Sequence, residues 1–275
     1  MKLKLSTAVP VASLLLGLAC SPAEAAPGAD ARFKTIYTKE WKWRVAEQLA
    51  RGEDERGVSP SFARVDAPVQ EARRVYWEGI LKELDGIRAA ELSPAERVNF
   101  AVYRAQIAAL LDAQRFREYE QPVNADSAFW TDVTFGARSP FGRLEDYRNY
   151  LKQLAALPGY FAQETDNMRA GLARGFTPPR VTLLGRDVAL ASIAEAKTPQ
   201  EVVFFTPFKT MPASIPATEQ EALRSQAAAV IREQVQPAYA RVLAFFRNEY
   251  VPKARATLAA ESMPGGKAYY QSKIV

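Results

Sequence analysis

The stretch Leu92–Phe116, LSPAERVNFAVYRAQIAALLDAQRF, decides the fold class of this chain. Ser93 is placed to accept a hydrogen bond from the backbone N–H of Glu96, whose carboxylate can reach back to the Ser93 N–H, as in the capping box that begins a helix. Pro94 suits the first turn, where a backbone N–H has no helical partner in any case. The apolar residues that follow recur at helical spacing and predict a broad face buried in a bundle. This predicted face comprises Val98, Ala101, Val102, Ala105, Ile107, Ala108, Leu111 and Phe116.

Helical spacing continues along most of the chain, so we expect a mostly α fold, a single multi-helix domain. No period-two alternation, tight hairpin turn or solenoid-length repeat interrupts it. Pro237 predicts a kink or a division of the last helix, whereas Gly175 and Thr177 predict a left-handed helix end and a new helix cap. Residues 119–142 lose the helical period and predict an aromatic-rich loop. The other predicted helices cover about residues 32–50, 68–90, 144–157, 158–173, 181–196 and 218–250.

The composition excludes several functions. The chain has 275 residues with 36 Lys and Arg against 31 Asp and Glu, and because the excess of +5 is scattered, it does not indicate nucleic-acid binding. The absence of His removes the commonest zinc ligand and general base, and with them the His-Glu-x-x-His site and the Ser-His and Cys-His catalytic pairs. The Gly-x-Ser-x-Gly, Walker A and Gly-x-Gly-x-x-Gly motifs are also absent.

The first 25 residues have the pattern of a secretory signal peptide. Two lysines precede an apolar run over residues 5–19, which is too short to span a bilayer, and small residues follow it. We expect cleavage before Ala26 and release into the periplasm; the alternative is a lipid anchor on Cys20, because residues 16–20 resemble a lipobox. Cys20 is the single cysteine, so we expect no internal disulfide. The predicted division is a signal peptide, residues 1–25, and a helical domain, residues 26–275.

Aromatic and basic residues at special positions are candidates for ligand contacts. Phe129 and Trp130 lie in the predicted loop, where rings can line a carbohydrate or peptide groove. Trp41 and Trp43 offer the same chemistry, but core packing is the favoured interpretation of all these rings, most strongly of Trp41. Arg180 follows two prolines at a predicted helix start, where its fork of donors suits a substrate carboxylate; a structural salt bridge is the favoured alternative.

Three pairs of neighbouring acidic residues raise the question of acid–base catalysis. Each pair stands on a predicted helix or beside one, among Lys and Arg side chains, so a solvated charged face is the favoured interpretation. The pairs are Glu83 with Asp85, Glu118 with Glu120, and Glu145 with Asp146.

Short motifs follow one another in a specific order between residues 40 and 270. They are EWKWR at 40–44, LSPAERVNF at 92–100, EDYRNYL at 145–151, LP at 157–158, GFTPPRV at 175–181, FTPF at 205–208, PAY at 237–239, EYVP at 249–252 and MPGGKAYY at 263–270. In this order they resemble the N-terminal half of the bacterial family called domain of unknown function 885 (DUF885).

The resemblance implies a helical protein, exported and often a lipoprotein, that is similar to zinc peptidases with a His-Glu-x-x-His motif in the C-terminal half. That half would follow Ser272, so we expect the truncated helical half of a zincin-like helical peptidase architecture. No catalytic residue is then expected in this chain and no cofactor, since zinc would belong to the missing half. The segments that the resemblance implies as groove lining are residues 177–180, with Arg180, and residues 265–270, with Tyr269 and Tyr270.

Three functional hypotheses remain open. The first is an exported N-terminal portion of a metallopeptidase-like protein, inactive alone, that forms one wall of a substrate cleft. The second is a standalone periplasmic binding or interaction protein. The third and weakest is an enzyme that uses a carboxylate pair. The expected partners are a peptide ligand and a C-terminal half or separate partner chain, with no nucleic acid and with membrane contact only through a lipid anchor on Cys20.

Overall fold

The computed structural model describes residues 28–52 and 57–274, and within them the chain forms helices and connections without a strand. The predicted mostly α fold is confirmed. The α-helices are α1 (Ala29–Ala46), α2 (Ala67–Asp85), α3 (Pro94–Arg115), α4 (Phe129–Asp132), α5 (Leu144–Ala173), α6 (Asp187–Ala194), α7 (Thr206–Lys209), α8 (Ala217–Val230), α9 (Gln236–Phe245), α10 (Val251–Lys253) and α11 (Gly266–Gln271). The 3₁₀ segments include η1 (Ala89–Glu91), η2 (Glu118–Glu120), η3 (Val133–Arg138), η4 (Arg180–Leu183), η5 (Pro199–Glu201), η6 (Val203–Phe205) and η9 (Ala260–Ser262).

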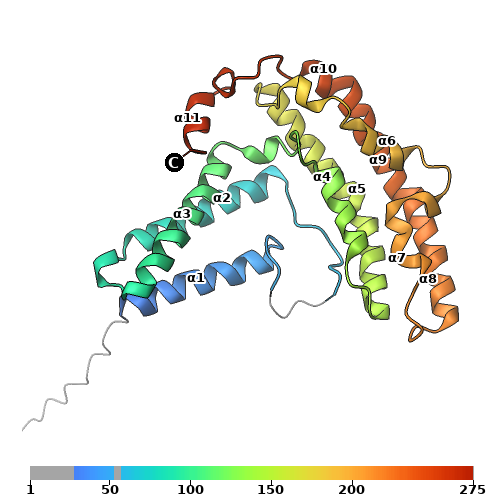
Figure 1. The fold of residues 1–275 in the computed structure, drawn as a ribbon, viewed down its shortest axis with the longest axis horizontal. Helices are drawn as coiled ribbons and strands as arrows, with labels where there is room; N and C mark the ends of the chain where they lie inside the picture. Colours follow the sequence, from blue (N-terminus) through green and yellow to red (C-terminus); the bar gives the residue numbers. More distant parts are fainter. Residues whose placement is uncertain (1–27, 53–56, 275) are drawn as a thin grey trace, which may run out of the picture.

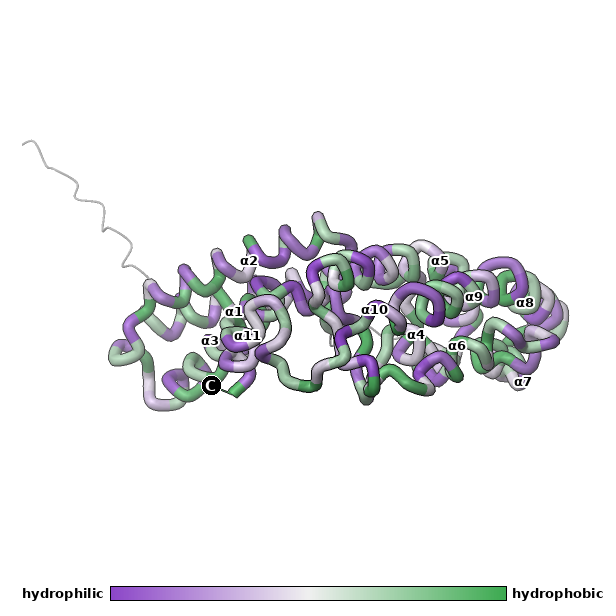
Figure 2. The backbone as a smooth tube through the Cα atoms, turned by 90° about the horizontal axis from the view of Figure 1, so that it is seen from above, coloured by the Kyte–Doolittle hydropathy of each residue, from purple (hydrophilic) through white to green (hydrophobic). Residues whose placement is uncertain are grey.

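The helices form two arms that meet at an angle (Figure 1). The N-terminal arm consists of α1, α2 and α3, and the C-terminal arm consists of α4 to α10. Each arm has its own cluster of buried apolar side chains. Purple and green alternate along the helices in Figure 2, as expected where one face of each helix packs on its own arm and the other faces solvent. The N-terminal cluster comprises Phe33, Ile36, Trp77, Ile80, Leu84, Ile87, Leu92, Phe100, Ile107 and Leu111.

The start of α3 is confirmed, but its cap differs from the prediction in one bond. The Ser93 hydroxyl accepts a hydrogen bond from the Glu96 N–H at 3.4 Å, as expected. The Ser93 N–H, however, donates at 3.0 Å to the carboxylate of Asp30 in the first turn of α1, and the Glu96 carboxylate accepts from Asn99 instead. The return bond of the predicted capping box is therefore wrong, because Asp30 on a neighbouring helix occupies the donor and ties α1 to α3.

The predicted apolar face of α3 is only partly buried. Ile107 and Leu111 are 0% and 1% exposed and belong to the N-terminal cluster. Val98 and Val102 are 65% and 66% exposed, so their predicted burial is wrong. The helix packs on α2 through one side of its apolar face, and the other side remains at the surface.

Helix α5 is the central element of the C-terminal arm and runs unbroken through Pro158, where two helices were expected. Leu157 and Phe161, on either side of the proline, are both buried in the core, and this packing offsets the cost of the lost backbone hydrogen bond. Its predicted end is confirmed. Gly175 has φ +75°, and the N–H of Phe176 donates to the carbonyl of Gly171 at 2.8 Å. This is the bond of a Schellman motif that spans five residues.

The predicted single helix over residues 181–196 is wrong. The chain instead forms η4, turns at Gly185 with φ +78°, and then forms α6. Thr177 does not cap this segment, because its buried hydroxyl accepts a hydrogen bond from the N–H of Arg255 at 3.1 Å. The region predicted as an aromatic loop, residues 119–142, holds the short helical turns η2, α4 and η3.

The last long helical stretch changes its winding before each of its two prolines. The π-helical turn η7 (Ile231–Val235) separates α8 from α9 ahead of Pro237, and η8 (Phe246–Tyr250) separates α9 from α10 ahead of Pro252. A proline lacks the N–H of the normal ladder and crowds the carbonyl four residues before it, which the wider π turn relieves. The predicted division at Pro237 therefore takes the form of a π-helical turn.

Candidate functional site

Phe129 and Trp130 lie in the core of the C-terminal arm, not at the surface. They are 3% and 1% exposed, and their rings meet edge to face with centroids 5.0 Å apart. Trp130 also packs on Phe246, and its carbonyl accepts a hydrogen bond from the buried Tyr239 hydroxyl at 2.6 Å. In this structure the two rings are covered by other side chains and pack as the favoured interpretation expected.

Arg180 connects the start of η4 to residues 252–255 through hydrogen bonds with backbone carbonyls. Its Nη2 donates to the carbonyl of Pro252 at 2.6 Å and to that of Ala254 at 3.1 Å, and its own N–H donates to the carbonyl of Arg255 at 2.7 Å. Its partners are therefore carbonyls that follow α9, and the expected carboxylate partner of a structural salt bridge is not among the contacts of this described residue.

Tyr269 lies in one of the two segments that the resemblance implied as groove lining, and it packs on the residue that precedes the other segment. Its ring lies 5.4 Å from that of Phe176 and 5.5 Å from that of Phe116, at the end of α3. Lys273, just after α11, forms an ion pair with Glu118, just after α3. The segment around α11 therefore runs from the C-terminal arm to the end of the N-terminal arm (Figure 1). Tyr270 is 56% exposed. Tyr269 of the segment 265–270 thus contacts Phe176, which directly precedes the segment 177–180, whereas Trp130 packs in the core of the C-terminal arm.

The acidic pairs do not all lie on solvated faces. Glu120 and Asp146 are each 3% exposed. Glu120 is paired with Arg174, and Asp146 accepts the N–H groups of Gly142 and Arg143 at 3.1 and 2.9 Å at the start of α5. Solvation is the wrong interpretation for these two carboxylates, because each is buried in a helix-terminal hydrogen-bond network. The pair Glu83 and Asp85 is exposed and bound to Lys39 and Arg104, as expected for a charged surface.

Ala26 and Cys20 lie outside the described residues. Within residues 28–52 and 57–274, no group of three or more His, Cys, Asp or Glu side chains is arranged to hold a metal ion. None of the helices in this part of the chain combines the length and the hydrophobicity that a bilayer crossing requires.

The most developed polar cluster surrounds Glu40 on α1, which the sequence did not single out as a site residue. Glu40 is 1% exposed. Its Oε1 accepts hydrogen bonds from Arg44 Nε at 2.5 Å and from Trp77 Nε1 at 3.0 Å, and its Oε2 accepts one from the Tyr103 hydroxyl at 3.0 Å. Three donors from three helices therefore satisfy one carboxylate, which fixes α1 against α2 and α3.

The charge of Glu40 also acts on the neighbouring phenol. Burial, followed by the Glu40 charge and hydrogen bond, raises the pKa of Tyr103 well above its usual value. The phenol therefore stays protonated and remains a donor to the carboxylate. Arg44 Nη2 is buried without a hydrogen-bond partner, and the Arg44 side chain as a whole is 12% exposed.

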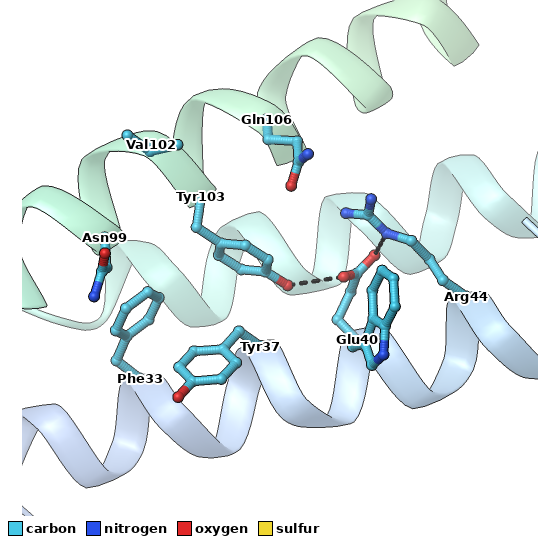
Figure 3. Close-up of a pocket in the computed structure, with 9 residues that line it drawn as sticks. Phe33, Tyr37, Glu40, Arg44, Asn99, Val102, Tyr103 and Gln106 are labelled. Carbon is cyan, nitrogen blue, oxygen red and sulfur yellow. Dashed lines mark hydrogen bonds and ion pairs between the residues drawn. The ribbon is translucent and has the colours of Figure 1, made fainter. Parts of the chain in front are cut away.

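A cavity of about 450 Å³ opens beside this cluster, between α1 and α3 (Figure 3). Four of its nine lining residues are aromatic, and the Glu40 and Arg44 side chains lie at one end (Figure 3). Trp41 is 43% exposed at the rim, so core packing was the wrong interpretation of this residue. The cavity is lined by Phe33, Tyr37, Glu40, Trp41 and Arg44 of α1 and by Asn99, Val102, Tyr103 and Gln106 of α3.

If the EWKWR motif is placed on a helix, the spacing of its residues indicates this site. Trp41 and Trp43 are two positions apart, which places them on different faces of a helix. Trp43 turns inward and stacks on Tyr76 with ring centroids 3.8 Å apart, whereas Trp41 reaches the cavity. Glu40 and Arg44, one turn apart, then mark the end of that cavity. Their partners on α2 and α3 become visible only once the bundle is assembled.

A second cavity, of about 680 Å³, lies between the arms. It is bounded by the connection from α1 to α2 and by η3 and α5 of the C-terminal arm. Gln48 and Gln153 line it and both donate to Ser61, whose hydroxyl lies 2.9 Å from Gln48 Nε2. The lining residues are Gln48, Leu49, Ala50, Arg51, Gly57, Val58, Ser59, Pro60, Gly136, Ser139 and Gln153.

A buried carboxylate on α5 lies close to the contact between the arms. Burial raises the pKa of Glu164 to about 7, although hydrogen bonds with Tyr160 and Asn167 act to lower it. Asn167 in turn donates to the carbonyl of Val65 at 2.8 Å, in the segment that leads into α2.

Comparison with known proteins identifies the family. The family model described as bacterial protein of unknown function (DUF885) matches residues 49–275, so α1 and the EWKWR motif precede the matched range. A solved structure titled as the "putative lipoprotein" from Colwellia psychrerythraea has a similar fold, with a TM-score of 0.71 and 15% sequence identity over 90% of this chain. The chain spans 46% of that protein. A comparison with curated proteins gave no match. The family match over most of the sequence shows that this chain belongs to the bacterial family DUF885.

Proposed function

We propose that this chain is the helical portion of a longer, exported, metallopeptidase-like protein, in which it forms one wall of a substrate cleft without catalysing hydrolysis itself. The observation that carries the proposal is the half-length match: nearly all of this chain superimposes on 46% of a solved relative. The rest of such a protein would supply the reacting groups.

The donor set of this chain supports that division of roles. A zinc site of the peptidase type needs His ligands, and the sequence has none. The described carboxylates do not form a group that could hold a metal either. The residues present therefore do not fit a zinc site, and no step of hydrolysis is assigned to them.

The cavity between the arms is the part of the surface that best suits a cleft wall. It is the largest of the cavities described above, at about 680 Å³, and both arms line it. Gln48 and Gln153 place amide groups there, and an amide can both donate to and accept from the backbone of an extended peptide. We propose this surface, rather than the buried Phe129 and Trp130, as the peptide-facing wall.

The proposal is tested by assaying the purified chain on a mixture of unstructured peptides, with added zinc and with a chelator. We expect no hydrolysis that the chelator abolishes. Chelator-sensitive peptidase activity in the 275-residue chain would overturn the proposed division of roles. Reading the genomic DNA beyond codon 275 gives an independent check, since a helical continuation with a His-Glu-x-x-His motif is expected there.

The alternative function is a standalone periplasmic binding or interaction protein. One observation favours it: each arm buries its own apolar cluster, with most members under 8% exposed, so the described chain supplies its own core. Scanning calorimetry separates the two proposals. A sharp, reversible unfolding transition of the isolated chain favours the standalone protein, whereas a broad transition with dye-binding apolar surface favours a half that needs its partner.

Export and the form of the N-terminus belong to the same proposal. Intact-mass measurement of the protein recovered from the cell envelope is expected to show Ala26 as the first residue. A mass that corresponds to a diacylated Cys20 would establish the lipid anchor in its place.

A further inference from the structure

Residues 61–65, which we call the strap, lead into α2 of the N-terminal arm and lie along α5 of the C-terminal arm. At the beginning of the strap, the carbonyl of Ser61 accepts a hydrogen bond from Gln153 at 3.4 Å. The Phe62 ring then stacks on Tyr160, with ring centroids 4.8 Å apart. The strap therefore connects the two arms through side chains of α5.

Val65, at the end of the strap, is bound through both of its backbone groups. Its N–H donates to Gln163 Oε1 at 2.8 Å, and its carbonyl accepts from Asn167 Nδ2 at 2.8 Å. The same carbonyl accepts from Gln70 of α2 at 3.4 Å. The four α5 side chains that hold the strap are separated by seven, three and four positions, so they lie along one face of the helix.

The carboxyl group of Glu164 lies on this same face of α5 and is 6% exposed. It is hydrogen-bonded with Tyr160 and Asn167, which are the residues that contact Phe62 and Val65 of the strap. The carboxyl is therefore one residue removed from the strap on two sides, and a change in its charge acts directly on the two contacts.

The charged and titratable groups around Glu164 come from α5, from α4 and from the junction of the strap with α2. The Tyr160 phenol favours ionisation of the carboxyl through its hydrogen bond, whereas the like charge of Asp132 on α4 disfavours it. The charged side chains at the junction make their contacts within that region; they are Arg64, Asp66 and Arg73. Among the described residues, no basic side chain forms an ion pair with Glu164.

We propose that the strap is a pH-dependent connection between the arms, held on α5 while the Glu164 carboxyl is protonated and released when this carboxyl ionises. A carboxylate without a basic partner needs water, and separation of the strap from Tyr160 and Asn167 admits it. Residues 58–60, directly before the strap, line the cavity between the arms, so release also changes one wall of that cavity. The inference does not depend on the proposed peptidase role.

The expected size of the effect follows from linkage between protonation and opening. Burial raises the pKa of Glu164 to about 7 from its ordinary value of 4.5. Because the pKa is raised in the closed form, protonation favours the closed strap, and opening increases as pH rises. If the open form has the ordinary pKa, the equilibrium constant for opening increases by up to about 300-fold across this range.

The test is hydrogen–deuterium exchange of the full chain, measured at the Val65 amide by mass spectrometry with fragmentation and corrected for the intrinsic exchange rate at each pH. We expect the protection of this amide to fall at least tenfold from about pH 5 to about pH 8. Amides of α9 are the internal reference. They are expected to exchange at least a hundredfold more slowly than Val65 at about pH 8, because α9 lies in the core and needs global unfolding.

Two variants on α5 identify the titrating group. Glu164→Gln keeps the shape of the side chain but does not ionise, so the Val65 amide is expected to keep its pH 5 protection at about pH 8. Asp166→Asn, at a 75% exposed side chain two residues further on, is expected to show the wild-type profile. Circular dichroism confirms that each variant remains folded.

Three results would overturn the proposal. One is equal protection of the Val65 amide at both pH values in the wild type, which needs no variant to observe. Another is a profile of Asp166→Asn that is as flat as the profile of Glu164→Gln. The third is exchange of the Val65 amide at the α9 rate at both pH values, since the strap would then open only when the whole protein unfolds.

Discussion

Arg44 and Glu40 lie one turn apart on α1, and the Arg44 Nε lies 2.5 Å from the Glu40 Oε1 in a site where the carboxylate is 1% exposed. Trp77 and Tyr103 donate to the same carboxylate from the two other helices of the arm. A charge removed from water in this way is stable only with its partners in place, so this pair controls how the three helices fit together.

Replacing Glu40 by Gln is expected to lower the free energy of unfolding by about 2–4 kcal/mol, because the substitution leaves the Arg44 charge without its counterion in a largely buried site. Urea denaturation followed by circular dichroism measures the change. The matched control is Glu83→Gln, whose carboxylate pairs with Lys39 at 2.7 Å on the exposed surface and is expected to contribute less than about 1 kcal/mol. Equal effects of the two substitutions would contradict the role given to Glu40.

Glu164 is expected to make stability fall as pH rises toward neutrality. Burial raises its folded-state pKa to about 7 from its ordinary value of 4.5, so between these values the folded protein keeps a proton that the unfolded chain has lost. The resulting loss in the free energy of unfolding is absent below about pH 4.5 and complete above pH 7, where it amounts to about 3 kcal/mol. Glu164→Gln removes it, so this variant is expected to gain stability over the wild type at about pH 8 but not at about pH 4.5.

The pH test has an internal comparison on the same helix. Asp166, 75% exposed and paired with Arg169, is replaced by Asn. The stability difference between this variant and the wild type is expected to vary with pH by less than about 1 kcal/mol, as for an exposed ion pair. If the difference in unfolding free energy between the wild type and Glu164→Gln stays constant across pH, the raised pKa of Glu164 is contradicted.

Trp130→Ala is expected to destabilise the protein by about 3–5 kcal/mol, because the indole is 1% exposed and packs on Phe129 and Phe246. Thermal or urea unfolding measures the loss. Phe135→Ala, at a 55% exposed position in the neighbouring η3, serves as the control and is expected to change stability by less than about 1 kcal/mol. Normal stability of Trp130→Ala would mean that the ring belongs to a ligand surface after all.

Two glycines of the α5 region should respond to alanine with opposite signs. Gly175 ends the helix at φ +75°, where a Cβ is strained, so Gly175→Ala is expected to cost about 1–2 kcal/mol. Gly159 lies exposed inside α5 with open space around its Cα, so Gly159→Ala is expected to stabilise by about 0.5–1 kcal/mol. Paired urea melts measure both values, and a loss of stability in Gly159→Ala would contradict the helical geometry at that position.

The sequence predicted local structure where the decisive atoms are close in the chain. The Ser93 cap of α3 and the left-handed Gly175 depend on hydrogen bonds within about one helical turn, and both are confirmed. The same local reasoning was wrong at Pro158, where flanking apolar side chains packed in the core keep α5 continuous. The hydrogen bond lost at a proline can be read from the sequence, but the packing energy that offsets this loss comes from residues distant in the sequence.

The candidate site shows the same limit of prediction from local sequence. The spacing of Glu40, Trp41 and Arg44 on one helix is readable from the sequence, but Tyr103 lies 63 residues away from Glu40 and Trp77 lies 37 away. The sequence by itself determined the helical class, the missing zinc ligands and the family resemblance, since these depend on composition, period and order. Only the tertiary structure decided which apolar face of α3 is covered and which carboxylates are buried, because burial depends on the neighbours that folding brings together.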